Sequence, residues 1–261
     1  RDVQPHEIYH LAGASHVGDS FEAPRATIES IAGLTAELLE GMRRHAPRAR
    51  FFHASSAEIF GRPAQVPQTE STALDPVSPY AGAKALATHL TRMYRDVHGL
   101  YCVNGILYNH ESVRRAGNFV TRKVCQGAAT IARGRSAELR LGNIDANRDW
   151  GYAPDYVRGM RAALQHATPQ DYIFATGQRR SVRDLLAVAF DYVDLDWRDY
   201  VVIDERFFRP SEPTRLLGDA SRAAAVLGWQ PETSFEAFIT EMTQAELDRL
   251  QHSPDEEERT H

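Results

Sequence analysis

The stretch "EIYHLAG" at residues 7–13, followed by "RATIESIAGLTAELLEGMRRHAP" at residues 25–47, decides the fold class. The first segment is short and apolar and ends in glycine, as buried strands do, whereas the second has apolar residues at helical spacing. The order then repeats: residues 50–56 ("RFFHASS") resemble a strand, a helix runs to about His98, and residues 101–109 ("YCVNGILYN") resemble another strand. This alternation predicts an α/β fold, with a parallel sheet covered by helices on both faces.

After about residue 112 the regular alternation weakens. We expect short strands at 137–143 and 171–177 and helices at 181–193 and 233–250. Both helices open with a capping-box pattern, Ser181…Asp184 and Thr233…Glu236. We therefore divide the chain into three parts. Residues 1–112 form a first domain, residues 113–250 form mainly a smaller α/β lobe, with some segments returning to the first domain, and residues 251–261 form a polar tail.

Composition excludes several classes of protein. The chain has 261 residues, of which 43% are hydrophobic and 25% charged, and its formal net charge is −5. No long basic run offers a surface for nucleic acid, and no long apolar run is suited to spanning a membrane. Two cysteines do not make a disulfide framework, and the N-terminal sequence lacks a signal-peptide pattern. We expect a cytoplasmic protein with no membrane, nucleic-acid or metal partner.

The segment "SPYAGAKALA" at residues 78–87 places a tyrosine and a lysine at the start of a predicted helix. Ser78 is a suitable N-cap and Pro79 suits the first turn, so Tyr80 and Lys84 share one helix face. A nearby ammonium lowers the pKa of a phenol, which would let Tyr80 accept a proton. Tyr-x-x-x-Lys also arises by chance on helix surfaces, so its surroundings must decide.

Those surroundings include "ASSAEIFG" at residues 54–61, which places Ser56 and Glu58 just past a buried strand. Ligands of parallel sheets gather beyond the carboxyl ends of the strands. A hydroxyl, a carboxylate, a phenol and an ammonium there suit chemistry at a carbinol: Tyr80 removes the hydroxyl proton, Ser56 holds the same oxygen, and Lys84 stabilises the phenolate. The alternative is that Ser56 only turns the chain and that Glu58 is solvated.

The chain resembles the GDP-mannose 4,6-dehydratases, which are extended short-chain dehydrogenases/reductases. The resemblance spans residues from about 5 to 247 and rests on "HLAGASHVGDSFEAP", "ASSAEIFG", "SPYAGAKALA", "NGILYNHESVRRAGNFVTRKV", "LRLGNIDANRDWGYAPDYV" and "RFFRPSEPTRLLGD". It implies a Rossmann-type, doubly wound parallel sheet with a smaller substrate-binding lobe. It also implies a hydro-lyase that converts GDP-mannose to GDP-4-keto-6-deoxy-mannose with tightly bound NADP, acting as a homo-dimer or homo-tetramer.

The resemblance also implies roles for particular residues. The catalytic positions are Ser56, Glu58, Tyr80 and Lys84, with Glu58 taking the proton from sugar C5. The cofactor positions are Leu11, Ala12, Ser15, Lys84, His110 and Arg115. The substrate positions are Asn109, Lys123, Gly142, Arg148, Arg209 and Glu212.

The sequence departs from the family pattern in two respects. It contains no G-x-x-G-x-x-G turn, so we expect about 60 residues of the family's first strands and helices to be missing from this chain. Ala57 stands where a hydroxyl or carboxylate is often found, which leaves the proton donor to the C6 hydroxyl open. Two alternatives follow: a 4-keto reductase or epimerase of the same superfamily, or a non-catalytic protein that binds sugar nucleotides.

Overall fold

The computed structural model describes residues 3–208 and 215–252. The chain divides into two compact units. The first unit comprises Arg1–His110, Asp149–Gln178 and Arg209–Glu232, and the second comprises Glu111–Arg148, Arg179–Phe208 and Thr233–His261. Among the described residues, no helix combines the length and the apolar character needed to cross a membrane.

The first unit is built on a four-stranded sheet in the order β1-β2-β3-β8, in which every pair of neighbours is parallel. Its strands are β1 (Glu7–His10), β2 (Arg50–Ser56), β3 (Tyr101–Leu107) and β8 (Tyr172–Phe174). The expected strands at 7–13, 50–56, 101–109 and 171–177 are thus confirmed, although three of them are shorter than expected. The predicted parallel α/β sheet is confirmed as well.

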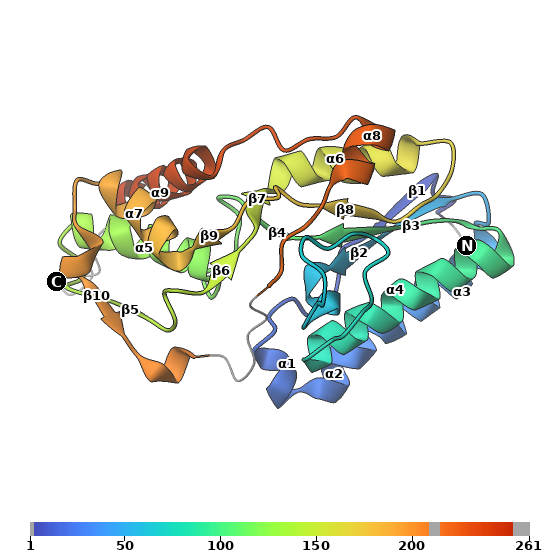
Figure 1. The fold of residues 1–261 in the computed structure, drawn as a ribbon, viewed down its shortest axis with the longest axis horizontal. Helices are drawn as coiled ribbons and strands as arrows, with labels where there is room; N and C mark the ends of the chain where they lie inside the picture. Colours follow the sequence, from blue (N-terminus) through green and yellow to red (C-terminus); the bar gives the residue numbers. More distant parts are fainter. Residues whose placement is uncertain (1–2, 209–214, 253–261) are drawn as a thin grey trace. The chain divides into compact units, whose positions relative to one another are not determined.

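Helices cover both faces of this sheet (Figure 1). One face carries α3 and α4, and the other carries α6 and α8. The side chains of a strand alternate between faces, so Phe51 packs towards α3 whereas its neighbour Phe52 packs towards α6. The helices of this unit are α1 (Asp19–Glu22), α2 (Pro24–Ile28), the π-helical turn η1 (Glu29–Gly33), α3 (Leu34–His45), α4 (Pro79–His98), α6 (Ala153–Gln165) and α8 (Ser221–Leu227).

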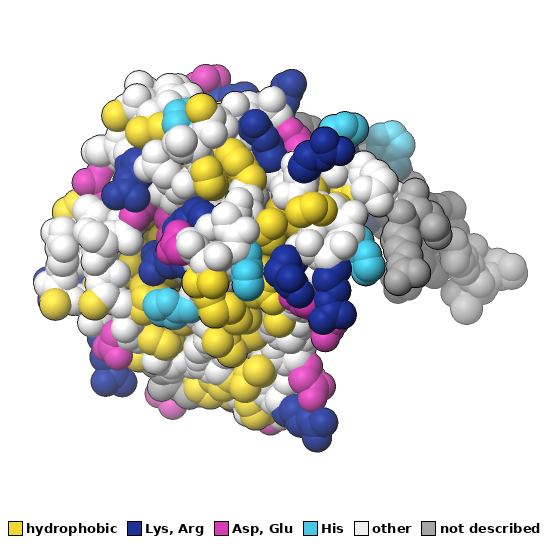
Figure 2. Space-filling view, turned by 90° about the vertical axis from the view of Figure 1, so that its right-hand side faces the viewer, with side chains coloured by type: hydrophobic (Ala, Val, Ile, Leu, Met, Phe, Trp, Pro, Cys, Tyr) yellow, Lys and Arg dark blue, Asp and Glu magenta, His cyan; other side chains and the backbone are white. Residues whose placement is uncertain are grey.

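The first unit also exposes large hydrophobic side chains. Leu86, Met93 and Val97 lie on one side of α4, at positions i, i+7 and i+11, and are 49%, 43% and 70% exposed. Ile28 and Leu34, at the end of α2 and the start of α3, are exposed too. Figure 2 shows one face of the molecule on which hydrophobic side chains gather between charged ones.

The second unit has a core of three helices, α5 (Val120–Ala132), α7 (Val182–Asp191) and α9 (Phe235–His252). The parallel pair β5 (Leu139–Leu141) and β10 (Val201–Ile203) and the antiparallel pair β6 (Asn147–Arg148) and β9 (Arg180–Ser181) belong to the same unit. Two 3-10 turns, η3 (Trp197–Asp199) and η4 (Glu205–Phe207), flank β10. The helices expected at 181–193 and 233–250 are confirmed.

Of the two expected capping boxes, only one forms. Ser181 and Asp184 cap α7 reciprocally, as predicted. The box Thr233…Glu236 is wrong, because α9 begins one residue later than the pattern implied. Ser234 precedes the helix, and its hydroxyl accepts the amide of Ala237 at 3.1 Å. A threonine followed directly by a serine offers two candidate caps, and the sequence does not distinguish between them.

Candidate active site

Helix α4 presents Tyr80 and Lys84 as the sequence predicts. The Ser78 hydroxyl accepts the amide of Ala81 at 3.1 Å, and Pro79 occupies the first turn, where its missing N–H costs nothing. The helix ends at Gly99, whose φ of 65° is left-handed and therefore suits glycine. Tyr80 and Lys84 are both buried in the first turns of this 20-residue helix.

Lys84 is held at the carboxyl end of β2. Its Nζ donates to the carbonyl oxygen of Ala54 at 2.7 Å and lies 6.0 Å from the centre of the Tyr80 ring. Burial lowers the pKa of Lys84 to about 8, because removal from water disfavours the charged form. The expected approach of the ammonium to the Tyr80 ring is confirmed, and its position is fixed by the strand backbone.

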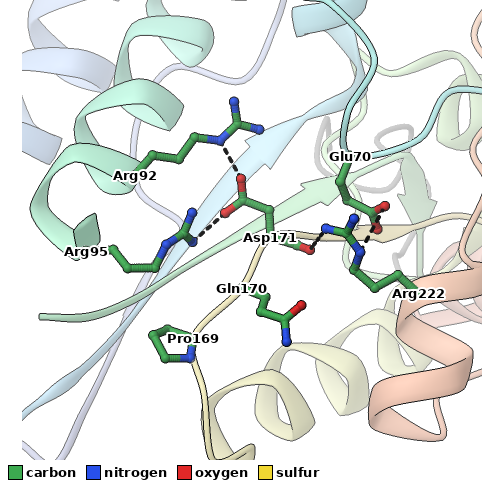
Figure 3. A pocket seen from close by; sticks show the side chains of 7 residues that line it. All are labelled: Glu70, Arg92, Arg95, Pro169, Gln170, Asp171 and Arg222. Atoms are coloured by element: carbon green, nitrogen blue, oxygen red, sulfur yellow. Dashed lines mark hydrogen bonds and ion pairs between the residues drawn. The ribbon is translucent and has the colours of Figure 1, made fainter. Parts of the chain in front are cut away.

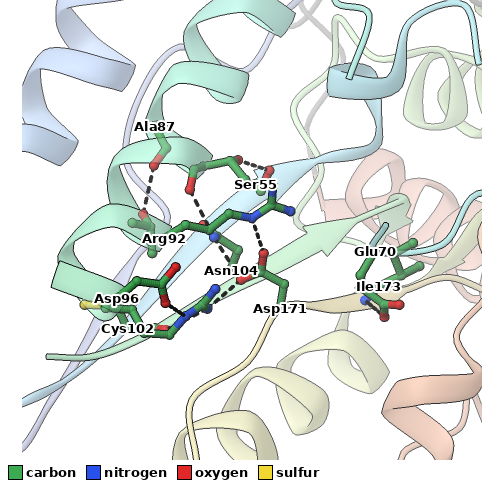
Figure 4. Close-up of polar contacts among 12 residues, drawn as sticks. Ser55, Glu70, Ala87, Arg92, Asp96, Cys102, Asn104, Asp171 and Ile173 are labelled. Carbon is green, nitrogen blue, oxygen red and sulfur yellow. Dashed lines mark hydrogen bonds and ion pairs between the residues drawn. The ribbon is translucent and has the colours of Figure 1, made fainter. Parts of the chain in front are cut away.

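A second bond fastens α4 to the same strand. The hydroxyls of Ser55 and Thr88 are 2.6 Å apart, and Thr88 also donates to the carbonyl oxygen of Lys84 at 2.8 Å. Since that uses the proton of Thr88, the Ser55 hydroxyl is the donor of the first bond. Ser55 is therefore buried between strand and helix, and Figure 4 shows it in this polar layer.

Ser56 and Glu58 lie where β2 gives way to the four-residue 3-10 helix η2 (Ala57–Phe60). The Ser56 hydroxyl accepts the amide of Glu58 at 3.3 Å and so caps this helix. Gly61 ends it with a φ of 51°, and a Cβ there would lie 1.8 Å from the carbonyl oxygen of Asp75. Glu58 is 9% exposed, so its carboxylate is not the solvated surface group of the alternative interpretation.

Two histidines lie near Lys84. His10 and His53 are in register on β1 and β2, with ring centres 5.7 Å apart. Thr35 donates to the carbonyl oxygen of Ile31, so its hydroxyl accepts from Nε2 of His10 at 3.1 Å. His53 is fully buried, and neither of its ring nitrogens has a hydrogen-bond partner among the described residues. Burial first, and then the charge of Lys84, lowers the pKa of both histidines, that of His53 strongly.

We did not predict this pair from the sequence. A polar residue inside each of two apolar strand segments, "EIYHLAG" and "RFFHASS", was the available signal.

We expect His53 to make the protein sensitive to acid. Its pKa in the folded chain lies well below the ordinary value near 6.5, so between these values the unfolded chain binds more protons. The stability present above about pH 6.5 is therefore lost as pH falls, by up to about 1.4 kcal/mol per pH unit for this one group. Urea unfolding of the wild type and of His53→Gln between about pH 5 and 7 measures this slope.

The variant should show a shallower slope than the wild type, by close to one proton. The exposed His45, replaced in His45→Gln, is the matched control. Equal slopes in the wild type and His53→Gln would contradict the assignment.

The cofactor candidates occur in both units. Leu11, Ala12 and Ser15 are exposed in the turn that follows β1, at the carboxyl end of the sheet. His110 follows β3; its Nδ1 donates to the carbonyl oxygen of Tyr108 at 2.8 Å, and its ring stacks on Tyr156 at 4.8 Å. Arg115 belongs to the second unit, where it lies 3.1 Å from Glu111 and 3.5 Å above the Phe119 ring.

The substrate candidates are divided in the same way. Asn109, half-buried, begins the short strand β4 (Asn109–Glu111), which pairs with β7 (Trp150–Tyr152). Lys123, Gly142 and Arg148 belong to the second unit, and Arg209 and Glu212 lie outside the described residues.

Within the second unit, Lys123 and Gly142 lie beside the same segment. Nζ of Lys123 is 3.9 Å from the centre of the Phe207 ring, and burial lowers its pKa. A Cβ on Gly142 would lie 2.6 Å from the carbonyl oxygen of Phe207, so only glycine fits there. Arg148 is 8% exposed, and its Nη1 donates to the carbonyl oxygen of Asn147 at 2.7 Å.

The parallel sheet, with Ser56, Glu58, Tyr80 and Lys84 at the carboxyl end of its strands, defines a Rossmann-type protein of the extended short-chain dehydrogenase/reductase class. Solved structures share this fold. RMD from Pseudomonas aeruginosa complexed with NADPH gives a TM-score of 0.87 at 24% identity, covering 95% of this chain and 83% of that one. dTDP-glucose 4,6-dehydratase from Bacillus anthracis in complex with NAD gives a TM-score of 0.80 at 20% identity, covering 97% of this chain and 75% of that one.

Sequence comparison identifies the family. A family model described as GDP-mannose 4,6 dehydratase matches residues 1–242. GDP-mannose 4,6 dehydratase 1 of Arabidopsis thaliana is 45% identical, with 94% of this chain and 69% of the relative covered. GDP-mannose 4,6-dehydratase of Sinorhizobium fredii is 42% identical, with 96% and 77% covered. The chain belongs to the GDP-mannose 4,6-dehydratase family of enzymes, which confirms the resemblance.

Proposed function

We propose that the protein dehydrates GDP-mannose to GDP-4-keto-6-deoxy-mannose, using tightly bound NADP. The observation that carries this proposal is the buried carboxylate of Glu58, next to Ser56 at the end of the strand to which Lys84 is tied. A 4-keto reductase needs a proton donor and a hydride, but it needs no base at C5. Family membership and this carboxylate together favour the dehydratase over the reductase or epimerase.

The oxidation at C4 is assigned to Tyr80, Lys84 and Ser56. Tyr80 takes the proton of the C4 hydroxyl, and Ser56 donates a hydrogen bond to the same oxygen. The ammonium of Lys84, fixed by the carbonyl oxygen of Ala54, stabilises the phenolate form of Tyr80 that accepts this proton. When bound, NADP would supply the hydride acceptor for C4 and the hydride donor for C6.

Elimination is assigned to Glu58. A ketone at C4 makes the C5 hydrogen acidic, and Glu58 removes it as water leaves C6. Ala57 has no group that can donate a proton to the leaving hydroxyl. We assign this donation to Tyr80, which has gained a proton in the first step, and the proton taken by Glu58 returns to C5.

The residues present fit a dinucleotide at the end of β1. Leu11 and Ala12 are exposed there, and Gly13 has a φ of 128°, a conformation that favours glycine and in which a Cβ would lie 3.1 Å from the Ile31 side chain. Ser15, Lys84 and His110 are the polar groups of the first unit that would hold its ribose and phosphates. Arg115 is proposed for the same cofactor from the second unit.

The proposed contacts with the sugar and the GDP are Asn109, Lys123, Gly142, Arg148, Arg209 and Glu212. A guanidinium fork such as that of Arg148 suits the paired oxygens of a diphosphate. We further propose that the second unit supplies most of the substrate lobe and that the protein acts in the cytoplasm.

We propose assembly as a homo-dimer or homo-tetramer through the outer side of α4. Leu86, Met93 and Val97 form an exposed apolar row there, which a second copy would cover. Light scattering after size exclusion tests this assembly: a monomer at micromolar concentration would exclude it.

Isotope transfer tests the reaction. With GDP-mannose deuterated at C4, we expect deuterium at C6 of the product, because the hydride removed in the first step returns in the last. Mass spectrometry and proton NMR of the product measure the label. Deuterium that remains on released, reduced cofactor would instead indicate a simple dehydrogenase or reductase, and sugar-nucleotide binding without turnover would indicate a binding protein.

A further inference from the structure

A polar pocket of about 260 Å³ lies in the first unit, away from the groups just described. It is bordered by the second half of α4, by residues 169–171 just before β8 and by the start of α8, which places it at the amino end of β8. Ser56 and Glu58 lie at the carboxyl end of β2. The charged residues that line the pocket are the arginines Arg92, Arg95 and Arg222 and the acids Glu70 and Asp171.

Asp171 lies at the centre of this pocket (Figure 3). Its carboxylate, 6% exposed, accepts Nε of Arg92 at 2.5 Å, Nη1 of Arg95 at 2.8 Å and Nδ2 of Asn104 at 3.0 Å. Burial would raise the pKa of Asp171, but Arg95 and Arg92 hold it below its ordinary value. Asp171 is thus fully neutralised by groups already present.

Two of these arginines, Arg92 and Arg222, have N–H groups that form no hydrogen bond within the described part of the chain. Arg92 gives only Nε to Asp171, and its two terminal nitrogens have no partner among the described residues. Figure 3 shows them on the side away from Asp171. Arg222, on the other side of Asp171, donates Nη1 to the Asp171 carbonyl oxygen at 3.3 Å and faces Glu70 through Nε at 3.5 Å; within the described part of the chain its Nη2 is also unengaged.

The charges that line the pocket do not cancel. Three guanidinium groups face two carboxylates, which leaves one positive charge in a chain whose formal net charge is −5. Asp96, which meets Nε of Arg95 at 3.2 Å, is 67% exposed, so water screens it. Guanidinium groups with unused N–H donors bind phosphate oxygens in pairs. The volume is below the usual range for drug-sized ligands, about 300–1,000 Å³, and suits a small anion.

We propose that this pocket binds a phosphate group, as inorganic phosphate or as the monoester of a small metabolite, through Arg92 and Arg222. Arg95 and Asn104 keep Asp171 in place, and Glu70, which accepts the amide of Ile173 at 2.9 Å, keeps Arg222 beside it. The site is separate from the proposed catalytic groups and does not depend on their assignment.

Calorimetry on the full chain tests the proposal. NADP and GDP are added first at saturation, so that phosphate sites at the catalytic edge are occupied. Inorganic phosphate and glucose 6-phosphate are then titrated separately into the wild type, Arg92→Gln, Arg222→Gln and the surface control Arg44→Gln. We expect millimolar binding in the wild type and Arg44→Gln, weakened about tenfold or more in each pocket variant.

The two titrants distinguish the sources of phosphate: equal affinities support inorganic phosphate, and tighter binding of the monoester supports a metabolite. No binding of either at about 10 mM to the wild type, or equal binding to all four proteins, would overturn the proposal. Phenylglyoxal labelling of the wild type, mapped by mass spectrometry, covers the case in which a variant does not fold. Phosphate should then slow modification of Arg92 and Arg222 but not of Arg44; equal rates with and without phosphate would overturn it too.

Discussion

Tyr80→Phe should lower turnover of GDP-mannose by about 10² to 10⁴, the range that a general acid–base group typically contributes. The substitution removes the proton acceptor and keeps the buried ring, so affinity for the substrate should change little. Initial rates and calorimetry with GDP-mannose measure the two effects separately. The loss should therefore appear in kcat.

Tyr94→Phe is the matched control. Tyr94 lies on the same helix and donates its hydroxyl to Glu40 at 3.1 Å, in a contact that takes no part in the proposed chemistry. It should retain wild-type turnover. If Tyr80→Phe kept more than about a tenth of wild-type turnover, Tyr80 would not be the base.

Glu58→Gln should separate oxidation from elimination. Proton removal at C4 belongs to Tyr80, so the variant should still transfer hydride to the cofactor; without a base at C5, however, water is not lost. We expect product formation to fall by about 10² to 10⁴, with accumulation of reduced cofactor and a 4-keto sugar that keeps its C6 hydroxyl.

Cofactor absorbance and mass spectrometry of the quenched mixture report the two species. Glu37→Gln, an exposed carboxylate of α3, controls for loss of charge and should behave as the wild type. Product formation at the normal rate in Glu58→Gln would remove Glu58 from the elimination step. Loss of both oxidation and elimination would mean that Glu58 acts before the hydride leaves.

The main sheet could be predicted from the sequence because its signals are local. Apolar runs such as "RFFHASS" and the helical spacing after residue 25 each identify one element without reference to the others. The short strands β4, β6, β7, β9 and β10 could not be predicted, since two or three residues are too few to show a period. The positions of Ser78, Tyr80 and Lys84 on one helix could be predicted for the same reason, because capping and helical spacing are local signals too.

The sequence could not show which partners those residues contact in the folded chain. The carbonyl oxygen of Ala54, which fixes Lys84, belongs to the backbone and leaves no mark in the residue types. Asp171 meets Arg92, Arg95 and Asn104 only because β3, β8 and α4 lie side by side. Each of these residues alone is typical of a solvated surface. Their convergence depends on tertiary structure.

The two hydrogen bonds between α4 and β2 imply that the groups of the redox step are already in place before substrate binds. Tyr80 and Lys84 belong to a long helix that is fastened to the sheet through Ala54 and through Ser55, so their placement requires no reorganisation when substrate arrives. Glu58 is held from the same strand, because the η2 turn that carries it follows β2 directly and buries Ile59 and Phe60 in the core. The groups assigned to the redox step and to the elimination step therefore share one support, so a displacement of β2 would disturb both steps together.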